Sequence, residues 1–138
     1  MKRIELKIKS DYKEVTPLCQ NVRAFCLNEG VEKKICNEIE ICLTEALNNI
    51  VKHSYKEDFT KTVNVIITSE NDWMKFDLIE TGIPRKEFHK PTLEFDPNDI
   101  ENLPEGGMGL YIIDQLMNEI SYKTENGVNI FTMKKNIV

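Results

Sequence analysis

Apolar and polar residues alternate at the start of the chain. Between residues 2 and 9, Ile4, Leu6 and Ile8 lie on one side and charged residues on the other, which predicts a strand with one face toward solvent. Four more segments are predicted to be strands and to form two hairpins, 62–69 with 73–79 and 120–124 with 128–134. The Asn-Gly pair at 126–127 is typical of a tight hairpin turn.

Three segments repeat their apolar residues every three or four positions. This period predicts helices at 12–28, 32–54 and 108–118. The strongest signal lies in 32–54, where one apolar stripe contains Ile35, Ile39, Cys42, Ala46 and Ile50. Gly30 follows the first helix, as a glycine just past a helix C-terminus commonly does.

The order of the predicted elements is β-α-α-β-β-loop-α-β-β. Because the strands come in antiparallel pairs with helices between them, the simplest packing is a two-layer α/β sandwich of the α+β class. This packing places three helices on one face of a mixed, mostly antiparallel sheet. The chain shows no internal repeat and no linker, so residues 1–138 are expected to form a single domain.

Residues 81–106 interrupt this order with a segment that has no apolar period. The segment contains four of the five prolines of the chain and many charged residues. Connections of this length are uncommon in compact domains and are usually functional or mobile. We therefore expect a functional loop here.

The composition is that of a globular protein, since 41% of the 138 residues are hydrophobic and 30% are charged. The longest apolar run, 110–113, is far too short to cross a membrane, and the N-terminus lacks the apolar stretch of a signal peptide. A cytoplasmic protein without membrane contact is therefore expected. The net charge of −5 argues against direct binding to nucleic acid. No CxxC pair occurs, which favours reduced thiols packed in the core at Cys19, Cys26, Cys36 and Cys42.

Glu45, Asn49 and His53 form the first candidate for chemistry. Steps of four residues place them along one side of the predicted helix 32–54, away from its apolar stripe. A carboxylate and an amide one turn apart supply the oxygen ligands that Mg²⁺ prefers, with water and phosphate completing its shell. A solvent-exposed helix face would show the same spacing, so these residues alone leave both interpretations open.

A run of glycines is the second candidate. Gly106, Gly107 and Gly109, with Met108 between them, precede the predicted helix 108–118. The free N–H groups and positive dipole at a helix N-terminus favour an anion such as phosphate. The lysine of a Walker loop is absent, and a glycine hinge leading into a helix is the alternative interpretation.

The third candidate is the segment Glu80-Thr81-Gly82 at the end of a predicted strand. The carboxylate of Glu80 could accept a hydrogen bond from the exocyclic amine of a base. The alternative is an ordinary exit from a strand into a loop.

Together, the three segments resemble the conserved boxes of the GHKL (Bergerat-fold) ATP-binding domains, which occur in histidine kinases and gyrase-type ATPases. Residues 45–53 match the N box, and residues 80–84 and 106–110 match the two glycine boxes. The short chain, the ExxxNxxxH helix and residues 107–120 are similar to the bacterial anti-sigma-factor serine kinases of the RsbW type. The resemblance extends over about residues 3–135.

The resemblance implies a role for each matching residue. Glu45 would be the catalytic base toward a substrate serine, and Asn49 would hold Mg²⁺ on the phosphates of ATP. Glu80 would bind the adenine amine, and Gly82 would let the ring approach the backbone. The remaining cofactor-binding positions would be His53, Gly106, Gly107, Met108 and Gly109. Residues 85–105 would form the lid over ATP.

One position departs from the family, which has aspartate where this chain has the longer Glu80. Two functions therefore stand side by side. In the first, the chain is a homodimeric serine kinase that uses Mg-ATP to phosphorylate an anti-anti-sigma (STAS-domain) protein and sequesters a sigma factor. In the second, nucleotide binding is weak or lost, and the chain acts only by binding proteins. A two-component catalytic domain is less favoured, because the chain is too short to include dimerisation helices with a phospho-acceptor histidine.

Overall fold

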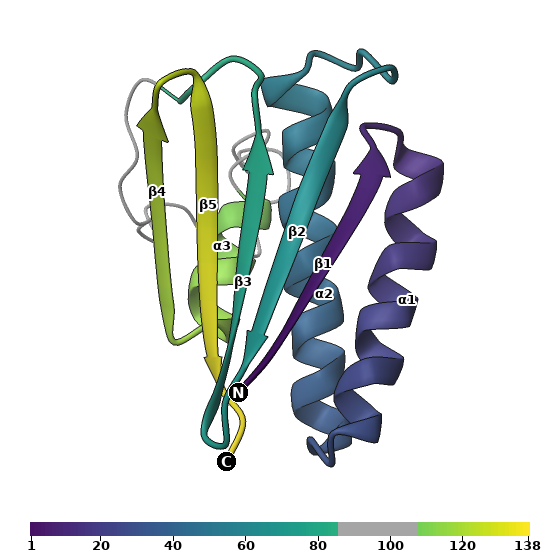
Figure 1. Ribbon diagram of the computed structural model, residues 1–138, viewed down its shortest axis with the longest axis vertical. Helices are drawn as coiled ribbons and strands as arrows, with labels where there is room; N and C mark the ends of the chain where they lie inside the picture. The colour runs from purple at the N-terminus through teal and green to yellow at the C-terminus, as the bar shows by residue number, and fades with distance from the viewer. Residues whose placement is uncertain (86–107) are drawn as a thin grey trace, which may run out of the picture.

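The computed structural model describes residues 1–85 and 108–138, which form one layer of sheet and one layer of helices (Figure 1). The strands are β1 (Lys2–Lys9), β2 (Thr62–Ser69), β3 (Trp73–Glu80), β4 (Glu119–Glu125) and β5 (Val128–Asn136). The helices are α1 (Tyr12–Asn28), α2 (Lys33–Asn49) and α3 (Met108–Leu116), and a π-helical turn, η1 (Ile50–Ser54), continues α2. The predicted α+β sandwich is confirmed.

The five strands lie in the order β1-β2-β3-β5-β4, and each neighbouring pair is antiparallel. The sheet that was expected to be mostly antiparallel is therefore antiparallel at every described pairing, with no parallel pair. The last strand, β5, lies between β3 and β4. This arrangement sets Glu80 at the end of β3 directly opposite Asn129 of β5.

Local sequence signals explain where the elements end. The turn between β4 and β5 has positive φ at both central residues, 54° at Asn126 and 78° at Gly127, as a type I′ turn requires. Gly30 has φ 84°, and its N–H donates to the carbonyl of Leu27, which ends α1. Helix α3 ends two residues before the predicted limit, because the N–H of Asn118 donates to β5 instead of to the helix.

The core fills the space between the sheet and the helices. Its largest fully buried side chains include Ile39, Leu43, Leu47, Ile67, Met74 and Phe76. The four cysteines are free and lie in the same layer, as predicted. Burial raises the pKa of the Cys26 and Cys42 thiols to about 12, so both stay protonated and poorly nucleophilic at neutral pH.

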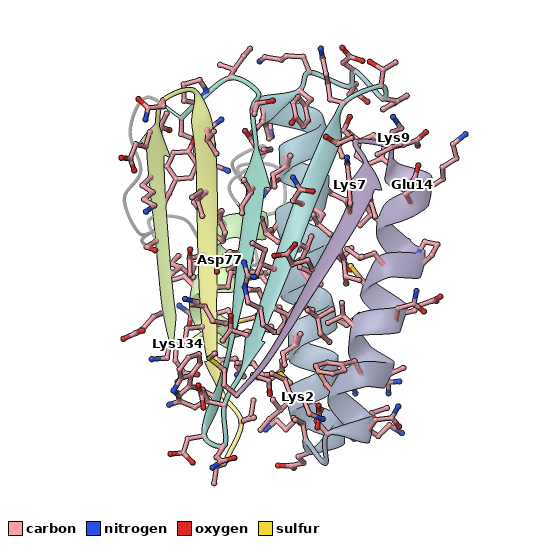
Figure 2. The ribbon with its side chains drawn as sticks, viewed as in Figure 1. Lys2, Lys7, Lys9, Glu14, Asp77 and Lys134 are labelled. Atoms are coloured by element: carbon pink, nitrogen blue, oxygen red, sulfur yellow. The ribbon has the colours of Figure 1, made fainter. Side chains whose placement is uncertain are left out.

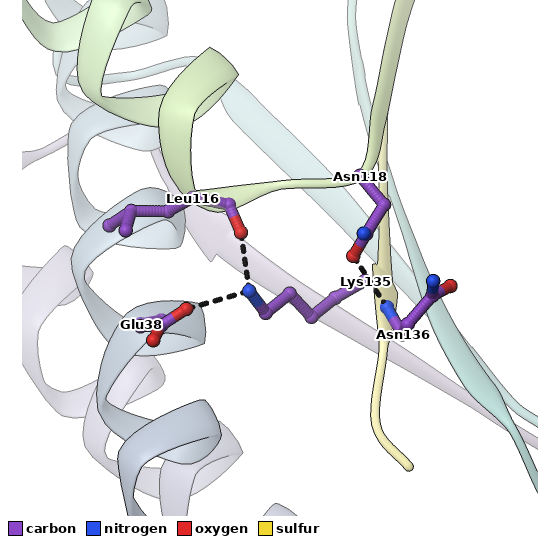
Figure 3. Close-up of polar contacts among 5 residues, drawn as sticks. All are labelled: Glu38, Leu116, Asn118, Lys135 and Asn136. Carbon is purple, nitrogen blue, oxygen red and sulfur yellow. Dashed lines mark hydrogen bonds and ion pairs between the residues drawn. The ribbon is translucent and has the colours of Figure 1, made fainter.

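The C-terminal end of α3 is fixed to α2 and β5 (Figure 3). Lys135 of β5 places its Nζ atom 2.6 Å from a carboxylate oxygen of Glu38 on α2, and the same Nζ donates to the carbonyl of Leu116. A cation at this position also complements the negative end of the helix dipole. Asn118 accepts a hydrogen bond from the N–H of Asn136 at 2.8 Å. These contacts hold the C-terminal end of α3 at its position along α2.

The face of the sheet away from the helices is largely polar, and Figure 2 shows Asp77 and Lys134 on it. Asp77 accepts a hydrogen bond from Thr132 at 2.6 Å, and the Lys134 ammonium lies 4.6 Å from the centre of the Trp73 ring. Within residues 1–85 and 108–138, no helix has the length and apolar character needed to cross a membrane.

Candidate functional site

The first turn of α3 lies directly on the polar side of α2. A Cβ atom added to Gly109 would stand 2.7 Å from Oε2 of Glu45 and 3.3 Å from Nδ2 of Asn49. Only glycine therefore allows the two helices to approach this closely without displacing a side chain. The fold thus brings two of the predicted segments together, because Glu45 and Asn49 face the N-terminal turn of the glycine-preceded helix.

A cavity opens beside this contact, between the helix layer and the ends of β3 and β5. Its atom-free space, counted together with the open solvent at its mouth, is about 390 Å³. One part of its lining is apolar: Ala46, Ile50, Leu78, Leu110, Ile113 and Phe131. The other part is polar: Asn49, Ser54, Glu80, Arg85, Tyr122 and Asn129. A flat apolar ring with a polar edge fits such a lining.

Glu80 is a buried carboxylate at this cavity, with 4% of its surface exposed. Its Oε1 atom accepts hydrogen bonds from the N–H of Gly82 at 3.0 Å and from Nδ2 of Asn129. Asn129 is itself 1% exposed, and its Nδ2 atom also donates to the carbonyl of Gly82 at 3.0 Å. The strand end and the turn after it are thus held together around one carboxylate oxygen.

Gly82 packs against the end of the long helix. A Cβ atom there would lie 2.3 Å from the carbonyl oxygen of Ser54, and the N–H of Ile83 donates to that same oxygen at 2.8 Å. The sequence assigned Gly82 to the approach of a ligand ring. In the structure the side of Gly82 that a side chain would occupy faces the backbone of η1. The glycine therefore allows the turn after β3 to pack against η1.

His53 lies in the π-helical turn, where the N–H of Tyr55 donates to the carbonyl of Ile50, five residues back. The side chain of His53 is exposed and is absent from the cavity lining, which contains its neighbour Ser54. Partial desolvation lowers the pKa of His53, and the cations Lys52, Arg85 and Lys56 lower it further. The structure therefore places His53 on a positively charged rim beside the cavity.

Several predicted positions lie outside the described residues. Gly106, Gly107 and nearly all of the predicted lid, 85–105, belong to this group, and Met108 is described only as the first residue of α3. Arg85, at the start of that lid, is described and lines the cavity. Its N–H donates to the hydroxyl of Tyr122 at 2.9 Å.

Sequence reasoning missed Asn129 and Tyr122. A signal for Asn129 was present, because it alternates with Phe131 and Met133 on the same face of β5 and is the polar member of that buried set. A polar residue on a buried strand face requires a hydrogen-bond partner. Its partner, Glu80, lies 49 residues away in the sequence.

The donor chemistry of Glu45 and Asn49 suits Mg²⁺, which binds oxygen ligands and keeps several waters. Among residues 1–85 and 108–138, no group of three or more His, Cys, Asp or Glu side chains is placed to hold a metal ion. A Mg²⁺ ion at Asn49 would therefore take most of its ligands from water and from the phosphates of a nucleotide.

The model of the histidine kinase-like ATPase domain matches residues 8–135. The chain belongs to this family. The matched range includes the end of α2, the end of β3 and the start of α3, which are the three parts of the site. The predicted GHKL resemblance is confirmed.

The histidine kinase-like ATPase chain is similar to curated bacterial proteins. It is 27% identical over 136 residues to the serine-protein kinase RsbW of Bacillus cereus, and 29% identical over 136 residues to that of Bacillus thuringiensis. Each match includes 96% of this chain and 84% of the relative. The resemblance to the RsbW type is thereby confirmed as well.

Two solved structures share the fold. The RsbU and RsbW domains of a Mycobacterium tuberculosis protein give a TM-score of 0.68 at 12% identity, over 98% of this chain and 32% of that one. The SiaB–SiaC complex of Pseudomonas aeruginosa gives a TM-score of 0.61 at 14% identity, over 97% and 89% of the two chains. At these identities the likeness concerns the fold alone.

Proposed function

We propose that this histidine kinase-like ATPase domain is an ATP-dependent serine kinase that phosphorylates an anti-anti-sigma (STAS-domain) protein and also sequesters a sigma factor. The observation that carries the kinase part is that Asn49 and Glu80 line one cavity, and that Glu45 and Asn49 meet the first turn of α3 at Gly109 beside it. The names of the curated RsbW relatives support the serine kinase activity.

The polar and apolar parts of the cavity lining suggest one orientation for ATP. The apolar lining would hold the adenine ring, and Glu80 at the inner end would accept its exocyclic amine. The triphosphate would then point toward Asn49 and the first turn of α3, where N–H groups and the helix dipole favour negative charge. Arg85, which lines the cavity, and the cations Lys52 and Lys56 near His53 add positive charge at its rim.

Asn49 would hold the Mg²⁺ ion through its side-chain oxygen. When bound, this ion neutralises charge that develops on the phosphate oxygens during phosphoryl transfer. The side chain of Asn49 is half-buried, and its Nδ2 atom lies beside the first turn of α3 at Gly109. Its position one helical turn from Glu45 keeps the ion and the base on the same side of the helix.

Glu45 would accept the proton of the substrate serine. The serine oxygen then bonds to the terminal phosphorus of ATP while the bond from that phosphorus to the bridging oxygen breaks, and ADP leaves. The carboxylate of Glu45 is half-exposed at the contact between α2 and α3, where an incoming hydroxyl can reach it.

The first test is calorimetric titration of Mg-ATP into the purified protein. Asn49→Ala should abolish micromolar binding, whereas Asn48→Ala, which removes a neighbouring amide that does not line the cavity, should preserve it. Wild-type protein that binds no nucleotide at millimolar concentration would contradict the proposal. That result would favour the second function, a module that acts only by binding proteins.

The second test is transfer of labelled phosphate from ATP to a panel of purified STAS-domain proteins. Glu45→Ala should remove the transfer, and Glu40→Gln, which changes another carboxylate of α2, should leave it intact. Labelling that survives Glu45→Ala would refute the assigned base. The homodimer and the sigma-factor complex, which rest on the family resemblance, can be measured separately by sedimentation of the chain alone and with sigma factors.

A further inference from the structure

Glu80 and Asn129 form a hydrogen-bonded pair that uses only one of the two oxygens of the Glu80 carboxylate. Oε1 of Glu80 accepts from both Gly82 and Asn129, whereas Oε2 accepts no hydrogen bond among the described residues. Both side chains line the cavity. The free oxygen is therefore the one that a ligand can use.

The amide of Asn129 has only one workable orientation. Its Nδ2 atom faces two acceptors, Oε1 of Glu80 and the carbonyl of Gly82, and its Oδ1 atom accepts from the hydroxyl of Thr124 at 2.7 Å. A flipped amide would set Oδ1 against two other acceptors and leave buried polar atoms unpaired. Thr124 and Gly82 thus fix Asn129, and Asn129 fixes Glu80.

We infer that Asn129 is a positioning residue for the base of the nucleotide, and that it adapts the site to glutamate at position 80. This inference rests on the proposed binding of ATP and goes beyond it. Holding Oε1 in place prevents the longer side chain from swinging aside, and it directs Oε2 toward the exocyclic amine of adenine. Glu80 and Asn129 therefore act as one unit that selects a purine bearing that amine.

Because the family has aspartate at this position, Glu80→Asp could be expected to restore tight binding of ATP. The pairing of Glu80 with Asn129 predicts the opposite. Here the substitution would withdraw the carboxylate by one methylene, about 1.5 Å, from an amide that Thr124 and Gly82 hold in place. The shorter carboxylate cannot reach Asn129 and the base together, so Glu80→Asp should weaken ATP binding.

The test compares ATP with purine riboside triphosphate, which lacks only the amine. The wild-type protein should bind ATP at least about tenfold more tightly, since ATP alone can donate a hydrogen bond to the charged Glu80 carboxylate. Asn129→Ala and Glu80→Asp should each bring this ratio close to one. The double variant should show the same ratio as either single variant, because each residue acts through the other. Asn64→Ala, an exposed strand asparagine, is the matched control.

A purely structural role for Asn129 would weaken both nucleotides equally and leave the ratio unchanged, which would overturn the inference. Tighter ATP binding by Glu80→Asp would overturn it too. Wild-type protein that binds neither nucleotide would instead contradict the proposed function. A second readout needs no nucleotide: the side-chain amide protons of Asn129 should exchange slowly in NMR spectra of the wild type and faster in Glu80→Asp. Equal exchange in the two proteins would also refute the coupling.

Discussion

A substitution at Gly109 should change phosphate transfer without lowering the stability of the domain. Gly109 is therefore the most informative position to change. In Gly109→Ala, the new Cβ atom would stand 2.7 Å from Oε2 of Glu45, closer than real Cβ contacts. The carboxylate is the end of a flexible side chain, so it can move while the helices stay in place. We therefore expect the variant to fold with the carboxylate of Glu45, the proposed base, displaced.

The size of this displacement follows from the same contact. Oε2 of Glu45 must retreat from 2.7 Å to at least 3.4 Å, where ordinary van der Waals contact begins. A misplacement approaching 1 Å in a catalytic group reduces turnover by up to about 100-fold. Asn49, at 3.3 Å, needs to move only slightly, so ATP affinity should change less than turnover. Replacing a helical glycine with alanine stabilises the helix by up to about 1 kcal/mol.

The assay is phosphate transfer to the proposed STAS-domain substrate, measured together with thermal melting and ATP titration. We expect turnover to fall about 10- to 100-fold while the melting temperature stays the same or rises. Gln115→Ala, an exposed substitution in the same helix, should leave all three measurements unchanged. Wild-type turnover in Gly109→Ala would refute the reasoning, because it would mean that the position of the Glu45 carboxylate does not matter for transfer.

Three further predictions concern the stability and reactivity of the fold. Gly82→Ala would place a Cβ atom 2.3 Å from the backbone oxygen of Ser54, which cannot swing aside. Urea titration should therefore show a loss of about 1–3 kcal/mol in unfolding free energy, and unchanged stability would contradict this contact. Glu38→Ala leaves the Lys135 ammonium, 12% exposed, without its carboxylate and should lower that free energy by about 1–2 kcal/mol. Glu119→Ala removes an exposed ion pair and should lower it by less than about 0.5 kcal/mol, so equal losses in the two variants would refute the difference in burial. Burial raises the pKa of all four cysteine thiols, so a thiol-reactive dye at pH 8 should label none of them in the native protein and all four after unfolding; rapid labelling of native protein would contradict their burial.

Much of the fold could be predicted because its signals are local. The alternation in the strands, the period of the helices and the Asn-Gly turn each involve neighbouring residues, and the described structure confirms them. The π-helical turn could not be predicted in the same way, because a tertiary contact holds its end. Tyr55 donates to the carbonyl of Thr62 at 2.7 Å and accepts from the N–H of Thr81 at 2.9 Å. His53 precedes this anchor, so its direction depends on residues far along the chain.

The residues of the site also divide into those with a local sequence signal and those whose position depends on tertiary contacts. Glu45 and Asn49 could be identified from their spacing on one helix, whereas the partner of Glu80 could not. The pairing of Glu80 with Asn129 depends on the register of β3 against β5, and that register follows from the insertion of the last strand between two others. A sequence pattern shows that position 80 carries an unusual carboxylate. Only the register shows which side chain holds it.

The two glycines of the site illustrate why a residue type alone does not define a role. In the sequence, Gly82 and Gly109 both follow the family pattern as residues that let a ligand approach. In the structure, Gly82 faces a rigid carbonyl of the protein, whereas Gly109 faces the movable side chains of Glu45 and Asn49. A side chain at position 82 must therefore shift the backbone, and one at position 109 must shift the side chains of Glu45 and Asn49. We therefore expect a side chain at position 82 to lower stability and one at position 109 to lower phosphate transfer.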